Sequence, residues 1–203
     1  MKLLRSTAVT NLMIAILSPG MKALPLVSQQ HVATQSVAAG ELRYKAPEGW
    51  VIEHPTSSMR VAQYKLPKAA GDSEDASLVL YYFGSDQGGS VQDNIDRWVG
   101  QIEKPDGSSS SDKAKTERLT VNGLRVTMID VTGTYTAEMS PGSGTRHNKP
   151  NYRLRAAIVE TPKGNYFAKL VGPEKTVNRW NRAFVDYVKS FEFKSPENRM
   201  NVL

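Results

Sequence analysis

The segment that most restricts the fold of this chain is an apolar strand that runs through a glycine-rich turn into an amphipathic helix. Residues from Ser77 to Phe83 are almost all apolar or aromatic, which is typical of a strand buried on both faces. The turn that follows contains Gly84, Gly88 and Gly89. Ser90 is a favourable N-cap, and the apolar residues after it recur at helical spacing as far as Ile102. Strand, turn and helix in this order predict a fold that mixes α and β structure.

Two hairpins determine which mixed fold is expected. Asn122-Gly123 tolerates the positive φ angles of a two-residue turn and joins strands predicted over 117–121 and 124–135. A second hairpin is predicted over 152–160 and 166–172. Further strands are expected over 50–52 and 59–66, and a second main helix runs from Pro173 to about Phe191. The fold class is therefore α+β: a single antiparallel β-sheet of about six to eight strands, packed by two main helices.

The N-terminus has the pattern of an export signal. Lys2 and Arg5 precede a short apolar stretch from Ala8 to Leu17, and small residues follow it. We therefore expect a signal peptide over 1–23, a linker over 24–40, the folded domain over 41–194 and a flexible tail over 195–203. The protein is expected to be exported, periplasmic or extracellular, and not membrane-spanning after cleavage. The chain has no cysteine, which removes disulfides and thiolate chemistry and is compatible with export.

Charge argues against one class of partner. The chain carries 26 Lys and Arg against 20 Asp and Glu, and the balance falls to 23 against 20 without Lys2, Arg5 and Lys22. The remaining charges are interspersed, whereas nucleic-acid binding normally requires a concentrated basic stripe. We expect no nucleic-acid partner.

Three stretches resemble the PsbP-like fold, which is shared with the Ran-binding Mog-type nuclear-import factors. The opening from Tyr44 to Trp50 is similar to the family's P-x-G-W entry, the strand from Tyr166 to Leu170 resembles its second hairpin, and the segment from Phe184 to Phe191 resembles its terminal helix. Segments 59–63, 88–90 and 94–98 look like a group of exported bacterial proteins without assigned activity. The resemblance implies a PsbP-like α/β sandwich that acts as a non-catalytic binding or assembly-accessory module.

Two interpretations are open for the glycine turn. Gly88, Gly89 and Ser90 lie where a strand meets a helix N-terminus, so their N–H groups could gather around an anion. The turn nevertheless lacks the lysine of a phosphate-binding loop, and Asp86 would repel a phosphate. The alternative is a tight connection that needs positive φ angles.

A second group of polar residues is expected near the same helix. Arg60 on a neighbouring strand, with Asn94 and Arg97 on the helix, could converge and bind a carboxylate through the planar guanidinium donors. Alternatively, Asn94 caps a strand end and Arg97 pairs with Asp93 or Asp96 on its own helix.

No catalytic constellation is visible, and no cofactor or metal is expected. His31, His54 and His147 are isolated in sequence, and Trp98 and Trp180 fall in apolar stripes typical of core positions. The sequence thus favours an exported non-catalytic domain whose partner is another envelope protein or a small anionic ligand. The alternatives are a small hydrolase-type enzyme that uses carboxylates or His147, and an envelope-tethered structural protein.

Overall fold

A computed structural model describes residues 34–35 and 42–194 of the chain. The signal peptide predicted over 1–23, the predicted tail over 195–203, and all of the predicted linker except 34–35 lie outside the described residues. The elements are β1 (Thr34–Gln35), β2 (Leu42–Lys45), β3 (Val51–Glu53), β4 (Arg60–Leu66), β5 (Ala76–Tyr82), α1 (Val91–Val99), β6 (Ile102–Glu103), the 3-10 turn η1 (Ser111–Lys113), β7 (Lys115–Val121), β8 (Leu124–Tyr135), β9 (Lys149–Thr161), β10 (Gly164–Pro173), α2 (Glu174–Arg179), α3 (Asn181–Lys189) and β11 (Glu192–Phe193).

An eight-stranded antiparallel sheet forms the centre of the domain. Its order is β3-β4-β5-β10-β9-β8-β6, and β7 pairs with β8. The predicted hairpins β7–β8 and β9–β10 are both present, and Asn122 and Gly123 have φ angles of 48° and 82° in the first turn. The α+β class and the antiparallel sheet predicted from the sequence are confirmed.

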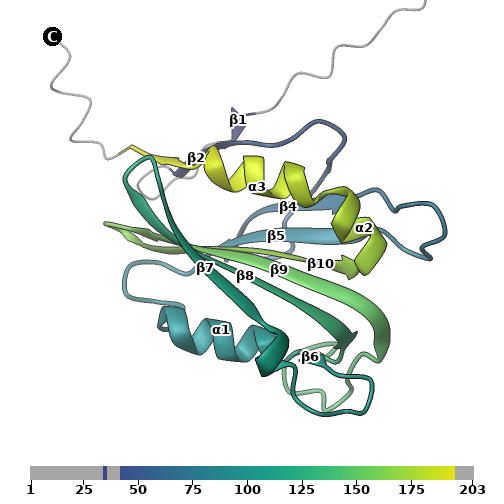
Figure 1. Ribbon diagram of the computed structural model, residues 1–203. Helices are drawn as coiled ribbons and strands as arrows, with labels where there is room; N and C mark the ends of the chain where they lie inside the picture. The colour runs from purple at the N-terminus through teal and green to yellow at the C-terminus, as the bar shows by residue number, and fades with distance from the viewer. Residues whose placement is uncertain (1–33, 36–41, 195–203) are drawn as a thin grey trace, which may run out of the picture. The chain divides into compact units, whose positions relative to one another are not determined.

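Helices cover both faces of this sheet. Figure 1 shows α2 and α3 on one side and α1 on the other. The alternation along β10 serves both layers: Tyr166, Ala168 and Leu170 enter the core beneath α3, whereas Phe167 packs with Trp98 of α1. Apolar side chains on both faces explain why the central strands are nearly continuous apolar runs.

The structure corrects one detail of the two predicted helices, because the helix expected from Pro173 onward is broken. Trp180 adopts φ −93° and ψ 4°, and α2 ends and α3 begins there. The Trp180 indole N–H donates to the Pro67 carbonyl at 2.9 Å, and the indole ring lies against Gly49. These contacts turn the chain at Trp180, so the described part of the domain has three α-helices.

The prediction of a single sheet also needs correction. A second, three-stranded sheet has the order β1-β2-β11 and lies outside the large sheet. Its strands are only two to four residues long, so they carry too few alternating positions to be recognised as a sheet. No helix in the described ranges is long and apolar enough to cross a membrane.

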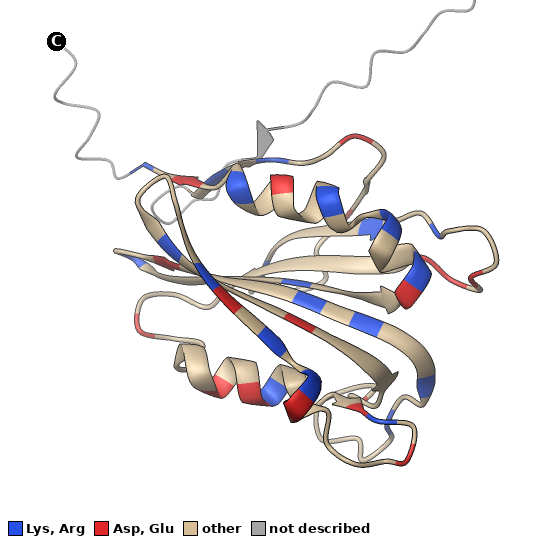
Figure 2. Ribbon diagram, in the orientation of Figure 1, with Lys and Arg blue, Asp and Glu red and all other residues tan. Residues whose placement is uncertain are grey.

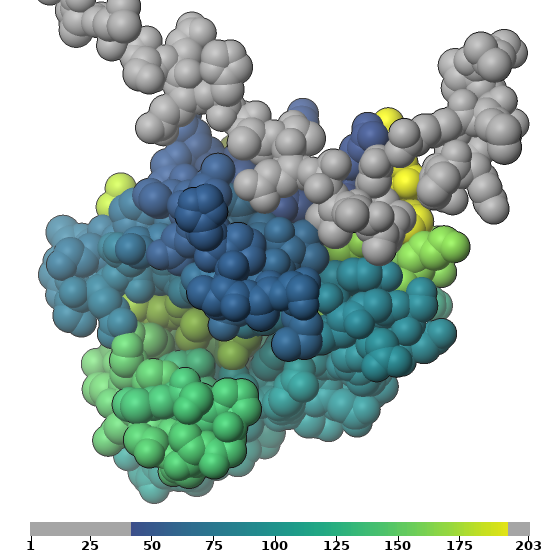
Figure 3. Space-filling model, turned by 180° about the vertical axis from the view of Figure 1, so that it is seen from behind, coloured from purple at the N-terminus to yellow at the C-terminus, as the bar shows by residue number. Residues whose placement is uncertain are grey.

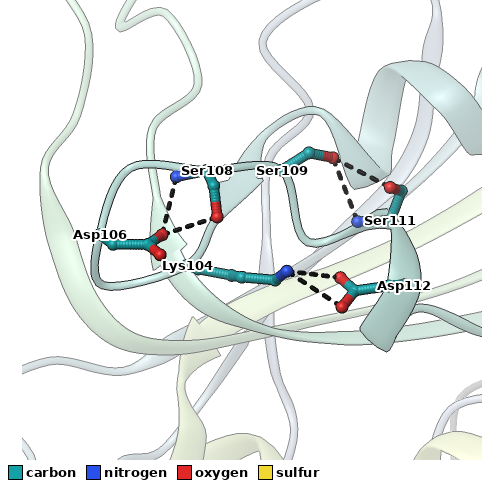
Figure 4. A network of polar contacts seen from close by, with 6 residues as sticks. All are labelled: Lys104, Asp106, Ser108, Ser109, Ser111 and Asp112. Carbon is teal, nitrogen blue, oxygen red and sulfur yellow. Dashed lines mark hydrogen bonds and ion pairs between the residues drawn. The ribbon is translucent and has the colours of Figure 1, made fainter.

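The serine-rich segment after α1 is held by its own polar side chains. Asp106 accepts hydrogen bonds from the backbone and side chain of Ser108, and Lys104 pairs with Asp112 at 2.9 Å (Figure 4). Ser110 is fully buried. Short-range hydrogen bonds of this type fix a turn without any periodic pattern of apolar residues. The sequence pattern therefore did not predict that this segment is ordered.

Candidate functional site

The glycine turn between β5 and α1 is built for close packing. Gly88 has a φ of 91°, and a Cβ placed there would lie 2.8 Å from ring atoms of both Phe83 and Phe167. Gly89 also has a positive φ, of 80°. Both conformations favour glycine, and the position of Gly88 further requires it for lack of space. The predicted need for positive φ angles is therefore met.

The N-terminus of α1 is occupied by its own capping box. The Ser90 hydroxyl accepts a hydrogen bond from the Asp93 N–H at 3.1 Å, and the Asp93 carboxylate accepts one from the Ser90 N–H at 3.3 Å. These bonds lower the pKa of Asp93. A hollow of about 400 Å³ lies beside the turn, but no Lys or Arg is among its lining residues and Asp86 is one of them. The geometry favours a structural turn over an anion site.

Asn94 connects this turn to the helix surface. Its side chain is buried, and the amide donates to the carbonyls of Gly88 at 2.7 Å and Ser90 at 2.8 Å. The same amide accepts a hydrogen bond from the Arg97 guanidinium. The structure thus brings Asn94 and Arg97 together, as one of the sequence interpretations expected. Arg97 pairs with Asn94 and not with Asp93 or Asp96.

Arg60 lies on the same face of the sheet, on β4. Its guanidinium donates to Gln63 at 2.7 Å and lies 5.8 Å from the centre of the Tyr81 ring. No hydrogen bond joins Arg60 to Asn94 or Arg97 within the described structure. The predicted group is therefore not a single cluster, and a third cation lies on the face between its members.

That third cation is Lys169, on the central strand β10. Its ammonium donates to the Gln101 side chain at 2.5 Å and lies 5.6 Å from the centre of the Tyr135 ring. The side chain is partly buried. Burial, with a smaller contribution from the nearby positive charge of Arg97, lowers the pKa of Lys169 to about 8. The amine is therefore charged at neutral pH, yet holds its charge only weakly.

The Tyr135 ring beside this lysine belongs to a group of aromatic side chains. The Tyr135 ring stacks on Tyr152 at 5.8 Å and on His147 at 5.3 Å, and Tyr81 stacks on Phe83 at 5.9 Å. Burial raises the pKa of Tyr135, and Tyr81 raises it further, so the two phenols lie close enough to influence each other. We call the surface formed by Arg60, Tyr81, Arg97, Tyr135 and Lys169 the α1-side recess.

The α1-side recess is visible from behind the molecule. Atoms in the yellow-green of β10 lie recessed between the blue region of β3 to β5, the green loop after β8 and the teal α1 (Figure 3). Elsewhere on the domain, Lys and Arg are interspersed with Asp and Glu (Figure 2). Within the described part of the chain, none of the ion pairs involves Arg60, Arg97 or Lys169.

Two carboxylates elsewhere on the sheet are engaged in ion pairs. Asp130 binds Arg153 through two hydrogen bonds, at 2.8 and 2.5 Å, and Glu160 pairs with Arg125 at 2.9 Å. The two carboxylates therefore do not form the dyad that a glycosidase-type mechanism would need. Among the described residues, no group of three His, Asp or Glu side chains is placed to hold a metal ion.

Lys169 was not predicted from the sequence, although one signal points to it. It is the only charged residue in the apolar run from Tyr166 to Val171 of a central strand, where an unpaired charge is costly. Gln101 and Tyr135 carry no such signal, because a helix end and a strand end bring them to the lysine only in the folded domain.

Comparison with known proteins concerns the fold alone. No family model matches the chain, and no curated protein matches its sequence. The solution structure of PsbP from the cyanobacterium Synechocystis is similar, with a TM-score of 0.48 and 11% identity over 79% of this chain and 91% of that chain. A crystal structure of a Pseudomonas aeruginosa protein of unknown function has a TM-score of 0.40 and 15% identity over 79% and 95%.

Proposed function

We propose that this protein is an exported, non-catalytic binding domain and that it binds a small anionic ligand in the α1-side recess. The observation that carries the proposal is the set of three cations, Arg60, Arg97 and Lys169, that border one aromatic-walled surface without a carboxylate partner. A cation partly removed from water gains free energy when an anion replaces the missing partner.

A binding role accounts for the polar groups better than a catalytic one. Asp130, Glu160 and Glu74 each pair with a basic side chain, and the His147 ring stacks on Tyr135. A hydrolase would need a nucleophile or a general base within hydrogen-bond reach of the substrate's position. The recess instead offers cations and amide groups, which bind and orient.

Export is tested on the native protein. We expect the mature N-terminus, sequenced after purification from the source cells, to begin near residues 21–24. The same preparation, analysed by mass spectrometry, tests the other partner that the sequence favoured, another envelope protein. An intact Met1 with no co-purifying envelope protein would contradict export.

Anion binding is tested by thermal shift on the mature protein with acetate, benzoate and inorganic phosphate as probes. We expect at least one probe to raise the melting temperature of the wild type and not of Lys169→Gln. Lys163→Gln removes the same charge from an exposed turn of the same hairpin and should behave like the wild type. A shift that is equal in all three proteins, or absent from all of them, would overturn the proposed site.

A further inference from the structure

We propose that the ligand of the α1-side recess is an aromatic carboxylate, with its carboxylate at Lys169 and its ring against the tyrosines. This inference rests on the proposed anion-binding function and narrows it to one chemical class. The geometry of the aromatic walls is what distinguishes this class from other anions.

The walls of the recess are flat. The planes of Tyr81 and Phe83 differ by 4°, and those of Tyr135 and Tyr152 differ by 11°. The two rings of each pair are close to parallel, whereas Tyr44, Tyr187 and Phe191 in the core beneath α3 meet edge to face. Tyr81, Phe83 and Tyr135 are only partly buried, so part of each ring is accessible. Flat apolar faces favour a flat apolar ligand group.

Two cations lie near those faces. The Lys169 ammonium lies 5.6 Å from the centre of the Tyr135 ring, within the range of a cation–π contact. Arg97, close enough to lower the pKa of that lysine, lies on the α1 side of it. A carboxylate between the two would offset their mutual repulsion and accept hydrogen bonds from both.

Neutral donors complete the site. Gln101 already accepts a hydrogen bond from Lys169, which leaves its amide N–H groups for a ligand oxygen. On the opposite side, Arg60 lies over Tyr81 and donates to Gln63. Cations and ring faces therefore lie next to each other across the recess, and an aromatic acid carries the matching pair of groups.

The amine also makes binding depend on pH. The groups that face Lys169 are Arg97 and Gln101 from α1 and the segment after it, and Tyr135 from β8; Tyr81 on β5 lies next to that tyrosine. Because its pKa is about 8 in the free protein, the amine loses its charge at lower pH than an ordinary lysine. Affinity for the carboxylate should therefore fall as the pH rises above about 8.

Three probes separate the contribution of the ligand's charge to binding from that of its aromatic ring. Benzoate has both features, cyclohexanecarboxylate keeps the charge without a flat ring, and benzamide keeps the ring without the charge. Amide chemical shifts of the labelled mature protein, titrated with each probe, give the affinity and its location. We expect benzoate to bind about tenfold more tightly than either control, a difference of about 1.4 kcal/mol, with shifts centred on β10, the end of β8 and α1.

Variants of Lys169 test whether the probe binds at the recess. Lys169→Gln should weaken benzoate binding about tenfold, as expected when a charged hydrogen-bond donor is removed, whereas Lys163→Gln should leave it unchanged. Lys169→Arg, which restores the charge, serves if the first variant does not fold and should retain binding. Unchanged affinity in Lys169→Gln, or shifts away from the recess, would overturn both this inference and the proposed function. Equal binding of benzoate and cyclohexanecarboxylate would overturn the aromatic class alone and leave the anion site intact.

Discussion

The side-chain amide of Asn94 donates a hydrogen bond to the backbone carbonyl of Gly88 at 2.7 Å. This bond joins the first turns of α1 to the glycine turn that precedes it. The Asn94 amide oxygen also accepts a hydrogen bond from the Arg97 guanidinium. One buried side chain therefore fixes the turn, the helix and a cation of the recess relative to one another. Asn94 therefore acts as a positioning residue for the α1-side recess.

Replacement of Asn94 by alanine should cost about 2 kcal/mol of unfolding free energy, because the Gly88 carbonyl loses its donor and a buried position loses its polar contacts. Urea unfolding monitored by tryptophan fluorescence measures this loss. Gln92→Ala is the matched control on the same helix, since its hydrogen bond to Asp96 is exposed and contributes about 0.5 kcal/mol or less. Equal losses in the two variants would show that Asn94 does not hold the turn.

Substitution of two glycines with similar φ angles should separate backbone strain from crowding. Gly107 has a φ of 81°, and a Cβ placed there would meet no heavy atom within 4 Å, so Gly107→Ala should cost only about 1 kcal/mol. Gly88→Ala adds a clash with the rings of Phe83 and Phe167, so the total loss should reach about 3 kcal/mol. Melting temperatures and urea midpoints of the two variants give the comparison. If both lose the same amount, the rings move away at little cost and the turn is less tightly packed than the structure indicates.

The sequence predicted those parts of the fold that depend on local patterns. Asn122-Gly123 requires a hairpin, and Ser90 with Asp93 places the start of α1, because both signals act within a few residues. The break at Trp180 was missed, since the apolar spacing continues through it and the turn is made by contacts to Pro67 and Gly49 far away in sequence. Long-range contacts of this kind carry no local pattern.

The site likewise combines contacts that follow a local pattern with contacts that only the fold brings about. Asn94 and Arg97 were expected to converge with Arg60, and the structure joins Asn94 to Arg97 on the same helix while Arg60 bonds Gln63. Lys169 joins the group only because β10 pairs between β5 and β9, and Tyr135 reaches it from the end of a different hairpin. Positions 60, 97, 135 and 169 are far apart in sequence. A single sequence could therefore suggest parts of this surface but not its assembly.

Asp130 should be more important for stability than an ion pair at the surface of the same two strands. Its carboxylate faces Arg153 and Arg155, whose side chains are 16% and 9% exposed. Asp130→Asn removes the carboxylate that two largely buried guanidinium groups pair with, and we expect a loss of about 3 kcal/mol.

The control for Asp130 is the pair between Glu160 and Arg125, in which the arginine side chain is 80% exposed. Glu160→Gln should cost less than about 1 kcal/mol, because solvent screens the pair. Urea unfolding at neutral pH and low salt measures both variants. Comparable losses would mean that water reaches Asp130 as readily as the surface pair.

The last prediction concerns stability and pH. The pKa of Lys169 is about 8 in the folded protein, against an ordinary value of 10.5, so its charged form is disfavoured by folding. Below about pH 8 the lysine is charged in both states and its burial lowers stability by a constant amount. Between about pH 8 and 10.5 the amine is largely neutral in the folded protein and still charged in the unfolded chain. The free energy of unfolding therefore rises with pH over this range.

Lys169→Met removes this cost, so the variant should be more stable than the wild type by about 1–2 kcal/mol near pH 7, after allowance for partial exposure of the side chain. The advantage should shrink steadily above about pH 8, as the wild-type amine becomes neutral. Urea unfolding of both proteins at about pH 7 and pH 9.5 measures the difference, and Lys163→Met, which removes a lysine from an exposed turn, is the control. An advantage of Lys169→Met that stays constant across this range would mean that the amine titrates like an ordinary lysine, and that the recess does not weaken its charge.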